Sequence, residues 1–200
     1  MKRLVINARL QKYPVVSRNV KMSAFKIYKK SEKFVFTRAL ISFTLFCVIL
    51  IFAALYEKEL KSTVIGEIIK YFLIILLIFG FVNSFFNRQL KGKLEGLLIL
   101  NRENIIIDEK KILIEEIKSI QIELNNYKRE YIGSVNPAIF LENFSNGTNN
   151  KITIKLNSDK TIVCYFQREH SNQIMRAYDS LSNYLDFGVL SRKNYDEITK

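Results

Sequence analysis

The chain of 200 residues is poor in the side chains that most often bind metals or perform catalysis. His170 is its single histidine, and its two cysteines, Cys47 and Cys164, are distant from each other in the sequence. A histidine-rich metal site is therefore excluded, and the cysteines have neither the spacing of a zinc site nor the number that a disulfide framework needs. Such sparse cysteine usage fits a reducing compartment.

The sequence also lacks the motifs of common active sites. It contains no glycine-rich phosphate loop and no nucleophile elbow. Glu115 and Glu116 are adjacent, so in a strand their carboxylates point to opposite faces. Cys164 alternates with Ile162 and Phe166 on the inward face of an expected strand, which predicts a buried and inert thiol. We therefore expect no enzyme, and no catalytic residue, cofactor or metal.

What the sequence does contain is a pair of long apolar runs, residues 34–56 and 64–86, separated only by residues 57–63. At about 1.5 Å per residue, each run forms a helix of roughly 34 Å. The hydrocarbon core of a bilayer is about 30 Å thick, so the runs predict a transmembrane helical hairpin. The first run is too long for a signal peptide, and we expect it to remain in the mature protein.

Basic residues flank both outer ends of this expected hairpin. Positive charge near the ends of spanning helices is retained in the cytoplasm. Five lysines lie shortly before the first run, and Arg88, Lys91 and Lys93 follow the second. The connection contains only Lys58 and Lys61. We therefore expect a multi-pass protein of the plasma (inner) membrane, with its N-terminus and C-terminus in the cytoplasm and a short extracytoplasmic loop.

Polar side chains interrupt the apolar runs at Arg38, Glu67, Lys70 and Asn83. The charged ones lie within about two turns of a helix end, where long side chains reach the headgroups. Glu67 and Lys70 have the i, i+3 spacing of an ion pair. Asn83 can make an interhelical hydrogen bond. In the alternative interpretation, these residues act inside a multi-copy helix bundle of a membrane sensor or transport accessory.

Residues 1–33 form a basic N-terminal segment with ten Lys or Arg and one Glu, in a chain of net charge +12. Apolar residues stand between the cations, which predicts a segment lying along the inner leaflet, where each cation gains on the order of 1 kcal/mol near anionic headgroups. Alternatively, residues 5–10 form a strand of the cytosolic sheet, and residues 16–30 form a helix leading into the membrane. The residues expected to contact lipid headgroups are Lys26, Lys29, Lys30, Lys33, Arg88, Lys91 and Lys93.

Nucleic-acid binding is another interpretation of this segment, because Tyr13, Phe25 and Tyr28 stand among the cations and could stack on bases. However, a segment attached to a spanning helix always has anionic lipid within reach, and the retention of positive charge already accounts for its lysines. We therefore expect membrane lipids, and no nucleic acid, as its partner.

After the second apolar run, short alternating segments predict a cytosolic domain of residues 91–185, followed by a tail of residues 186–200. Period-two alternation is typical of half-buried antiparallel sheet. From 168 to 185 apolar residues recur at helical spacing, and Gly188 follows where a left-handed cap is often needed. We expect His170 to cap or precede this helix. The expected strands are residues 94–100, 105–107, 111–115, 117–124, 151–156 and 161–166, with the last two paired as a hairpin.

The stretch of residues 125–150 is long for a connection. Long loops often carry function, so this loop and the exposed edge of the sheet form the expected surface for a partner, although a solvated turn region fits equally well. Residues 138–141 are a candidate seventh strand. The expected partner-loop residues are Asn143, Phe144, Asn146, Gly147 and Asn149.

The order of elements, a membrane hairpin, short strands and a final helix, carries a family resemblance. Its segments are Gly-Leu-Leu-Ile-Leu at 96–100, Asn-Ile-Ile-Ile at 104–107, Ile-Glu-Glu-Ile-Lys-Ser-Ile at 114–120, Ser-Asn-Gly-Thr-Asn-Asn at 145–150, and the helix at 178–185. Over residues 34–185 the chain resembles bacterial membrane-tethered proteins with a pleckstrin-homology-like domain. The resemblance implies a membrane α-helical hairpin plus an α+β, mainly-β domain of about seven antiparallel strands and one C-terminal helix, which serves as a binding platform.

These observations predict an integral membrane protein that presents a small pleckstrin-homology-like domain at the cytoplasmic face. We expect a scaffold or protein-interaction module without catalysis, whose partners are anionic headgroups and either another protein or further copies of the chain. Tethering raises the local concentration of membrane-bound partners, so a weak surface can suffice. The alternative is a membrane sensor or transport-accessory subunit that acts through the helix hairpin.

Overall fold

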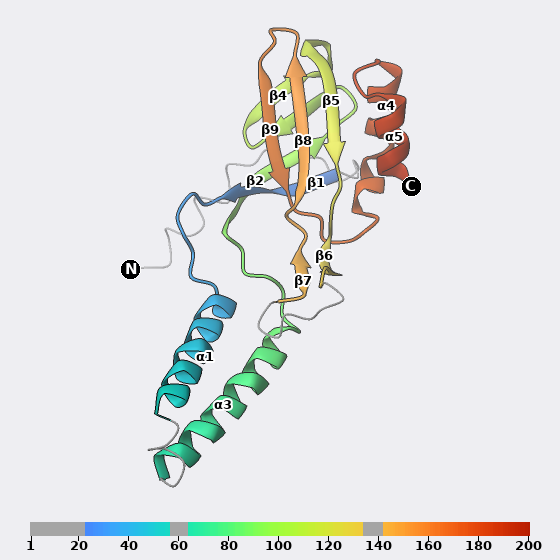
Figure 1. Cartoon of the computed structure of the whole chain (residues 1–200). Coiled ribbons are helices and arrows are strands. Elements are labelled where there is room, and N and C mark those ends of the chain that lie inside the picture. Colours follow the sequence, from blue (N-terminus) through green and yellow to red (C-terminus); the bar gives the residue numbers. More distant parts are fainter. Residues whose placement is uncertain (1–22, 57–63, 134–141) are drawn as a thin grey trace, which may run out of the picture.

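The structure, a computed structural model, describes residues 23–56, 64–133 and 142–200. Within these residues, a pair of helices projects from one end of a β-sheet domain (Figure 1). The helices pack against each other, and both connect to the same end of the domain. This arrangement confirms the two apolar helices and the mainly-β sheet domain that the sequence predicts.

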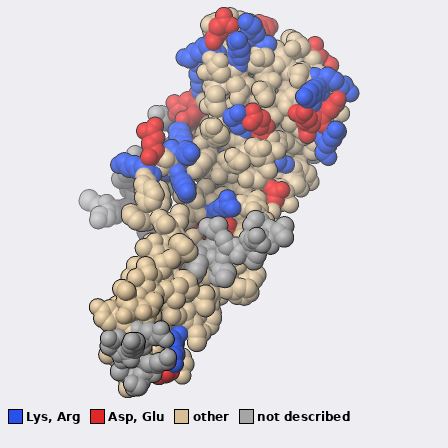
Figure 2. Space-filling model, in the orientation of Figure 1, with Lys and Arg blue, Asp and Glu red and all other residues tan. Residues whose placement is uncertain are grey.

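The hairpin consists of α1 (Arg38–Leu55) and α3 (Val64–Asn83), which within the described residues are two helices long and apolar enough to cross a membrane. Few of their residues are buried, and their apolar side chains form a continuous exposed surface. On the face shown in Figure 2, charged groups are absent from the hairpin except near its tip. A core helix of a water-soluble domain would instead be mostly buried.

Both helices are shorter than the apolar runs that predicted them. α1 begins at Arg38 because Thr37 is its N-cap, whose side chain accepts a hydrogen bond from the Leu40 amide. α3 ends at Asn83, and the next residues continue in tighter turns, in which the Phe86 amide donates to the carbonyl of Asn83. The expected limits of 34 and 86 therefore each included a few non-helical residues.

Within the described residues, seven strands form one antiparallel sheet, ordered β4-β3-β2-β1-β9-β8-β5. Six of the strands lie close to the expected ranges, and the expected hairpin of residues 151–166 is confirmed. The strands are β1 (Ser23–Lys30), β2 (Gly92–Leu100), β3 (Asn104–Ile107), β4 (Lys110–Leu113), β5 (Ile117–Glu123), β8 (Asn150–Leu156) and β9 (Thr161–Phe166).

Within this sheet, the sequence interpretation missed β1, which occupies the middle between β2 and β9. The expectation of a helix over residues 16–30 is wrong for Ser23–Lys30. The side chains of Ser23, Phe25 and Ile27 alternate inward and are buried, but Lys26, Lys29 and Lys30 disguised this period. Residues 5–10, the other candidate strand, lie outside the described residues.

The sheet changes direction where β1 meets β9: Figure 1 shows β1 running across the direction of β8 and β9, and Ile27 and Phe166 are the single registered pair between β1 and β9 in the described chain. A bulge in β2 helps the bend, with Gly96 in the left-handed region at φ +83°. The two halves of the sheet then enclose one core, in which the rings of Phe25 and Phe166 meet edge to face at 5.1 Å. β1 thus joins the two halves.

The expected C-terminal helix is divided into η3 (Gln173–Ala177) and α4 (Tyr178–Asp186). Leu181 and Tyr184 of α4 enter the core with no exposed surface. The cap at Gly188 is confirmed, since its φ is +73° and its amide donates to the Leu185 carbonyl. His170 precedes η3, as expected.

The expected tail of residues 186–200 contains a further helix, α5 (Arg192–Thr199), with Ser191 as its N-cap. Its Asn194 side chain accepts from the Ile122 amide and donates to the Ile122 carbonyl, both at 2.8 Å. The Ile120 amide donates to Val189. These bonds occupy the outer edge of β5, so this edge is not free to accept an added strand. At the other edge, β4 is short and carries two lysines, which also discourages strand addition.

Candidate functional site

The helical hairpin is an insertion between two neighbouring strands of the sheet. β1 ends at Lys30, which lies opposite Gly92 at the start of β2. Just beyond this pair, the Ser31 amide donates to the Lys91 carbonyl at 2.8 Å. Consequently, the chain leaves the sheet, passes through α1 and α3, and returns to the strand beside the one it left.

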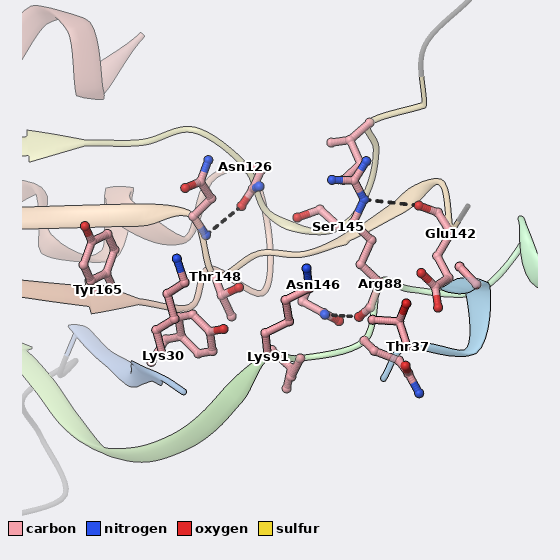
Figure 3. A pocket seen from close by; sticks show the side chains of 16 residues that line it. Lys30, Thr37, Arg88, Lys91, Asn126, Glu142, Ser145, Asn146, Thr148 and Tyr165 are labelled. Atoms are coloured by element: carbon pink, nitrogen blue, oxygen red, sulfur yellow. Dashed lines mark hydrogen bonds between the residues drawn. The ribbon is translucent and has the colours of Figure 1, made fainter. Parts of the chain in front are cut away.

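A groove of about 710 Å³ lies at this junction between the hairpin and the sheet domain (Figure 3). Thr37 and Ala39 contribute from the start of α1, and Lys30 and Lys91 contribute from the ends of the paired strands. The opposite wall comes from the described parts of the 125–150 stretch and from β9. The remaining lining residues are Tyr28, Arg88, Gln89, Leu90, Asn126, Ile132, Glu142, Ser145, Asn146, Thr148, Asn149 and Tyr165.

Lys30 and Lys91 are the available cations of the groove. Figure 3 shows both side chains reaching from the β1 and β2 ends toward the wall that carries Asn146 and Thr148. Neither ammonium group has an ion pair or a hydrogen bond with another described residue. Burial raises the pKa of Tyr28 on the same side, so its phenol stays protonated at neutral pH.

The other lysines expected to contact headgroups are placed differently. Lys26 pairs with Glu169 at 3.7 Å, Lys29 with Asp108 at 3.5 Å, and Lys93 with Glu95 at 3.7 Å. These are exposed pairs, each of which contributes little to stability. Lys33 is exposed in the segment before α1 and does not line the groove.

Arg88 lines the groove but is engaged in fastening the hairpin to the domain. Its Nε donates to the Glu142 carbonyl at 3.2 Å, and its amide donates to the Phe144 carbonyl at 2.8 Å. The Asn146 side chain donates to the Arg88 carbonyl. The Asn143 amide likewise donates to Ser84, just after α3, at 3.2 Å. Arg88 therefore positions the groove wall.

The expected partner loop is consequently part of the junction. Within it, β6 (Lys128–Tyr131) pairs with β7 (Phe144–Asn146), and both lie between the main sheet and the hairpin (Figure 1). Residues 138–141, proposed as a strand, lie outside the described residues. Of the five expected loop residues, Asn146 and Asn149 line the groove.

The other expected loop residues have structural roles. Asn143 is buried, and the Phe144 ring packs edge to face on Tyr131 at 5.9 Å. Gly147 has φ +71°, and a Cβ there would lie 2.2 Å from the carbonyl oxygen of Arg168. A side chain cannot be accommodated at this position without moving the backbone.

Asn150 shapes the groove wall although sequence reasoning did not single it out. It is completely buried, and its Oδ1 accepts from the amides of Asn125 at 3.0 Å and Asn126 at 3.3 Å. Its Nδ2 donates to the Gly147 carbonyl at 2.7 Å. The side chain thus joins the two arms of the turn region. The only sequence signal was the density of asparagine, which also suits an ordinary solvated turn.

A second contact fixes the hairpin to the domain at Glu142, whose side chain is 6% exposed. The Nε atom of Arg38 lies 4.0 Å from its Oε1, an ion-pair distance that is too long for a hydrogen bond. The Arg38 guanidinium also lies over the Phe86 ring, 5.4 Å from its centroid. Arg38 therefore links the first residue of α1 to both the domain and the end of α3.

Two other expectations are confirmed away from the groove. Glu67 and Lys70 form an ion pair with 2.6 Å between Oε1 and Nζ. Cys164 is buried, and burial raises the pKa of its thiol to about 11. A thiol of that pKa is almost entirely protonated at neutral pH, as expected for an inert core cysteine.

Comparison of the chain with protein-family models, with curated proteins and with solved structures finds no match. The functional interpretation is therefore based on the geometry of the junction.

Proposed function

We propose that the protein is a non-enzymatic integral membrane protein whose α1 and α3 span the bilayer and hold the β-sheet domain against one leaflet. At about 1.5 Å per residue, helices of 18 and 20 residues measure roughly 27 and 30 Å, close to the thickness of the hydrocarbon core. Lipid would cover the exposed apolar surface of the hairpin, which is larger than water-soluble monomers tolerate.

The observation that carries this proposal is the pairing of β1 with β2 on either side of the hairpin. Strands that share hydrogen bonds must lie on the same side of a membrane. A chain that enters the bilayer after β1 must therefore return before β2, which an antiparallel pair of spanning helices achieves. The basic residues at both outer ends of the hairpin favour the cytoplasm as this side.

For the domain, we propose a pleckstrin-homology-like fold that serves as a binding platform of a bacterial inner-membrane protein. The strands follow one another as neighbours along most of the sheet, and the C-terminal helix packs on the core, which supports this assignment. The proposed partner is a protein or a second copy of the chain. It would approach along the membrane surface, because the loop residues expected to bind it lie at the junction.

A second candidate function is a membrane sensor or transport-accessory subunit. The contact that favours it is between Arg38 of α1 and the buried Glu142 of the domain, because a movement of the helix would disturb a buried carboxylate. In that case, replacing Arg38 would alter the output of the domain without altering membrane insertion.

Cysteine labelling in cells tests the topology. In a variant without Cys47 and Cys164, a cysteine at Lys58 should react with a membrane-impermeant maleimide in cells whose outer membrane is permeabilised and whose inner membrane is intact. A cysteine at Lys193, exposed on α5, should react only after the inner membrane is permeabilised. Labelling of position 193 in intact cells would refute the cytoplasmic placement, and recovery of the protein in the soluble fraction would refute membrane insertion.

Photo-crosslinking in the membrane tests the partner proposal. A photoreactive residue at position 149 should give a discrete adduct with a neighbouring protein or a second copy, whereas one at position 193 should not. Point substitution is the appropriate design here, because deletion of the loop would remove β7 and the buried Asn150. Equal adducts from both positions would contradict a partner surface at the junction.

A further inference from the structure

The groove lies at a defined depth relative to the proposed membrane. Thr37 is the N-cap of α1, and Ala39 lies in its first turn, and both line the groove. If α1 enters the hydrocarbon core near its first residue, the groove opens in the headgroup layer of that leaflet. At this depth the ligand at the highest local concentration is the phosphate of a phospholipid.

The charge of the groove suits an anion. Lys30 and Lys91 supply two ammonium groups that no other described residue neutralises. Glu142 is the acidic residue among those lining the groove, and the Nε atom of Arg38 lies 4.0 Å from its carboxylate at the far end. Arg88 binds the backbone carbonyl of Glu142. The centre of the groove therefore has positive charge without a protein counterion among the described residues.

Neutral donors line the wall that the lysines face. The Asn126 Oδ1 atom accepts from the Asn149 amide at 3.2 Å, and the Asn126 NH₂ group makes no hydrogen bond to another described residue. The hydroxyls of Thr148 and Tyr165 likewise make no hydrogen bond to another described residue. Figure 3 shows the Lys30 ammonium between Tyr165 and Thr148. A phosphate has only acceptor oxygens, so ammonium, amide and hydroxyl donors match it chemically.

We propose that this groove binds the phosphate of an anionic phospholipid, with Lys30 and Lys91 as its charged contacts and Asn126, Thr148 and Tyr165 as neutral donors. The volume of about 710 Å³ admits a glycerophosphate group and not only the phosphate itself. The inference rests on the proposed membrane insertion. A free phosphate ion has the same chemistry, and the two sources are separated by experiment.

The test uses the full-length protein in nanodiscs of phosphatidylcholine containing one tenth phosphatidylglycerol, followed by native mass spectrometry of the lipids that stay bound. The groove variant is Lys30→Gln with Lys91→Gln. The control is Lys160→Gln with Lys193→Gln, which removes the same charge from exposed lysines that do not line the groove. Thermal unfolding of both variants verifies that the domain is folded.

We expect wild type and control to retain phosphatidylglycerol in preference to phosphatidylcholine, and the groove variant to lose this preference by about tenfold or more. Thr148→Val should weaken it by a smaller factor while leaving all charges in place. Equal losses in the groove and control variants would show a diffuse effect of charge and overturn the inference. Unchanged retention in the groove variant would also overturn it.

Inorganic phosphate distinguishes the source of the ligand. If 10 mM phosphate displaces phosphatidylglycerol completely, or binds wild type when the lipid does not, the assignment to a lipid is overturned. A protein that never enters nanodiscs or membranes refutes the proposed function itself. A protein that inserts normally but has no preference for phosphatidylglycerol refutes the groove inference alone.

Discussion

Lys30, the last residue of β1, lies directly opposite Gly92, the first residue of β2, although the whole helical hairpin separates them in the sequence. The strands approach so closely here that a Cβ on Gly92 would lie 2.2 Å from the carbonyl oxygen of Lys29. The hairpin is therefore fastened to the sheet at both of its ends.

A disulfide should form between β1 and β2 when Lys29 and Lys93 are both replaced by cysteine. These residues are register partners, and directly opposed residues in antiparallel strands lie within about 4.5–5.5 Å between Cα atoms, which is suitable for a disulfide. Oxidation should shift the gel mobility of the unreduced protein. Lys26→Cys with Lys93→Cys is the mismatched control, because Lys26 pairs with Leu97. Efficient cross-linking of the control would contradict the register.

Phe25→Ala should destabilise the sheet domain by about 3–5 kcal/mol, because it removes a buried ring that packs on Phe166. Pulse proteolysis in increasing urea would measure the change in the free energy of unfolding. Phe187→Ala, at a side chain that is 59% exposed, should change it by less than about 0.5 kcal/mol. Similar values for the two variants would mean that β1 does not belong to the core.

Asn194→Ala should cost about 1–3 kcal/mol of stability, because it leaves the amide and carbonyl of Ile122 without partners at the edge of β5. Hydrogen exchange at Ile122 should accelerate in the native state. Lys193→Ala, at the preceding exposed position of α5, serves as the control and should behave like wild type. Unchanged exchange in Asn194→Ala would show that α5 does not protect this edge.

Cys164 should resist alkylation in the folded protein. A pKa raised to about 11 from 9.0 lowers the thiolate fraction at pH 8 by about a hundredfold, and burial blocks access as well. In a Cys47→Ser background, maleimide should label Cys164 only after denaturation. Rapid labelling of the native protein would place this thiol outside the core.

The sequence predicted the elements whose periodicity was undisturbed. β8 alternates cleanly between apolar and polar residues, β5 does so from Ser119 onward, and the apolar runs predicted both helices of the hairpin. β1 was missed because Lys26, Lys29 and Lys30 suggested contact with lipid, although Phe25 and Ile27 already alternate. Position beside an expected membrane helix outweighed a short period-two pattern in that interpretation.

α5 was missed for a related reason, since a charged C-terminal segment resembles a solvated tail. Ser191 with Asn194 three residues later was the cap signal, and Tyr195 with Ile198 was the buried face. The groove could not be predicted as a unit, because its residues are far apart in the sequence. They come from β1, the start of α1, the segment between α3 and β2, the asparagine-rich turn and β9. Sequence reasoning had named Lys30, Arg88 and Lys91 as lipid contacts and Asn146 and Asn149 as partner-loop residues, and so placed them in two unrelated sets.

The place of β1 in the sheet also sets the order of events during synthesis. The ribosome makes β1 before the hairpin, whereas both strands that flank β1 in the finished sheet, β2 and β9, are made after it. β1 therefore has neither neighbouring strand available while α1 and α3 are being synthesised. The sheet can form only after β2 and β9 have been made and pair with β1. A complete sheet is therefore evidence that the chain has returned to β1 after the hairpin.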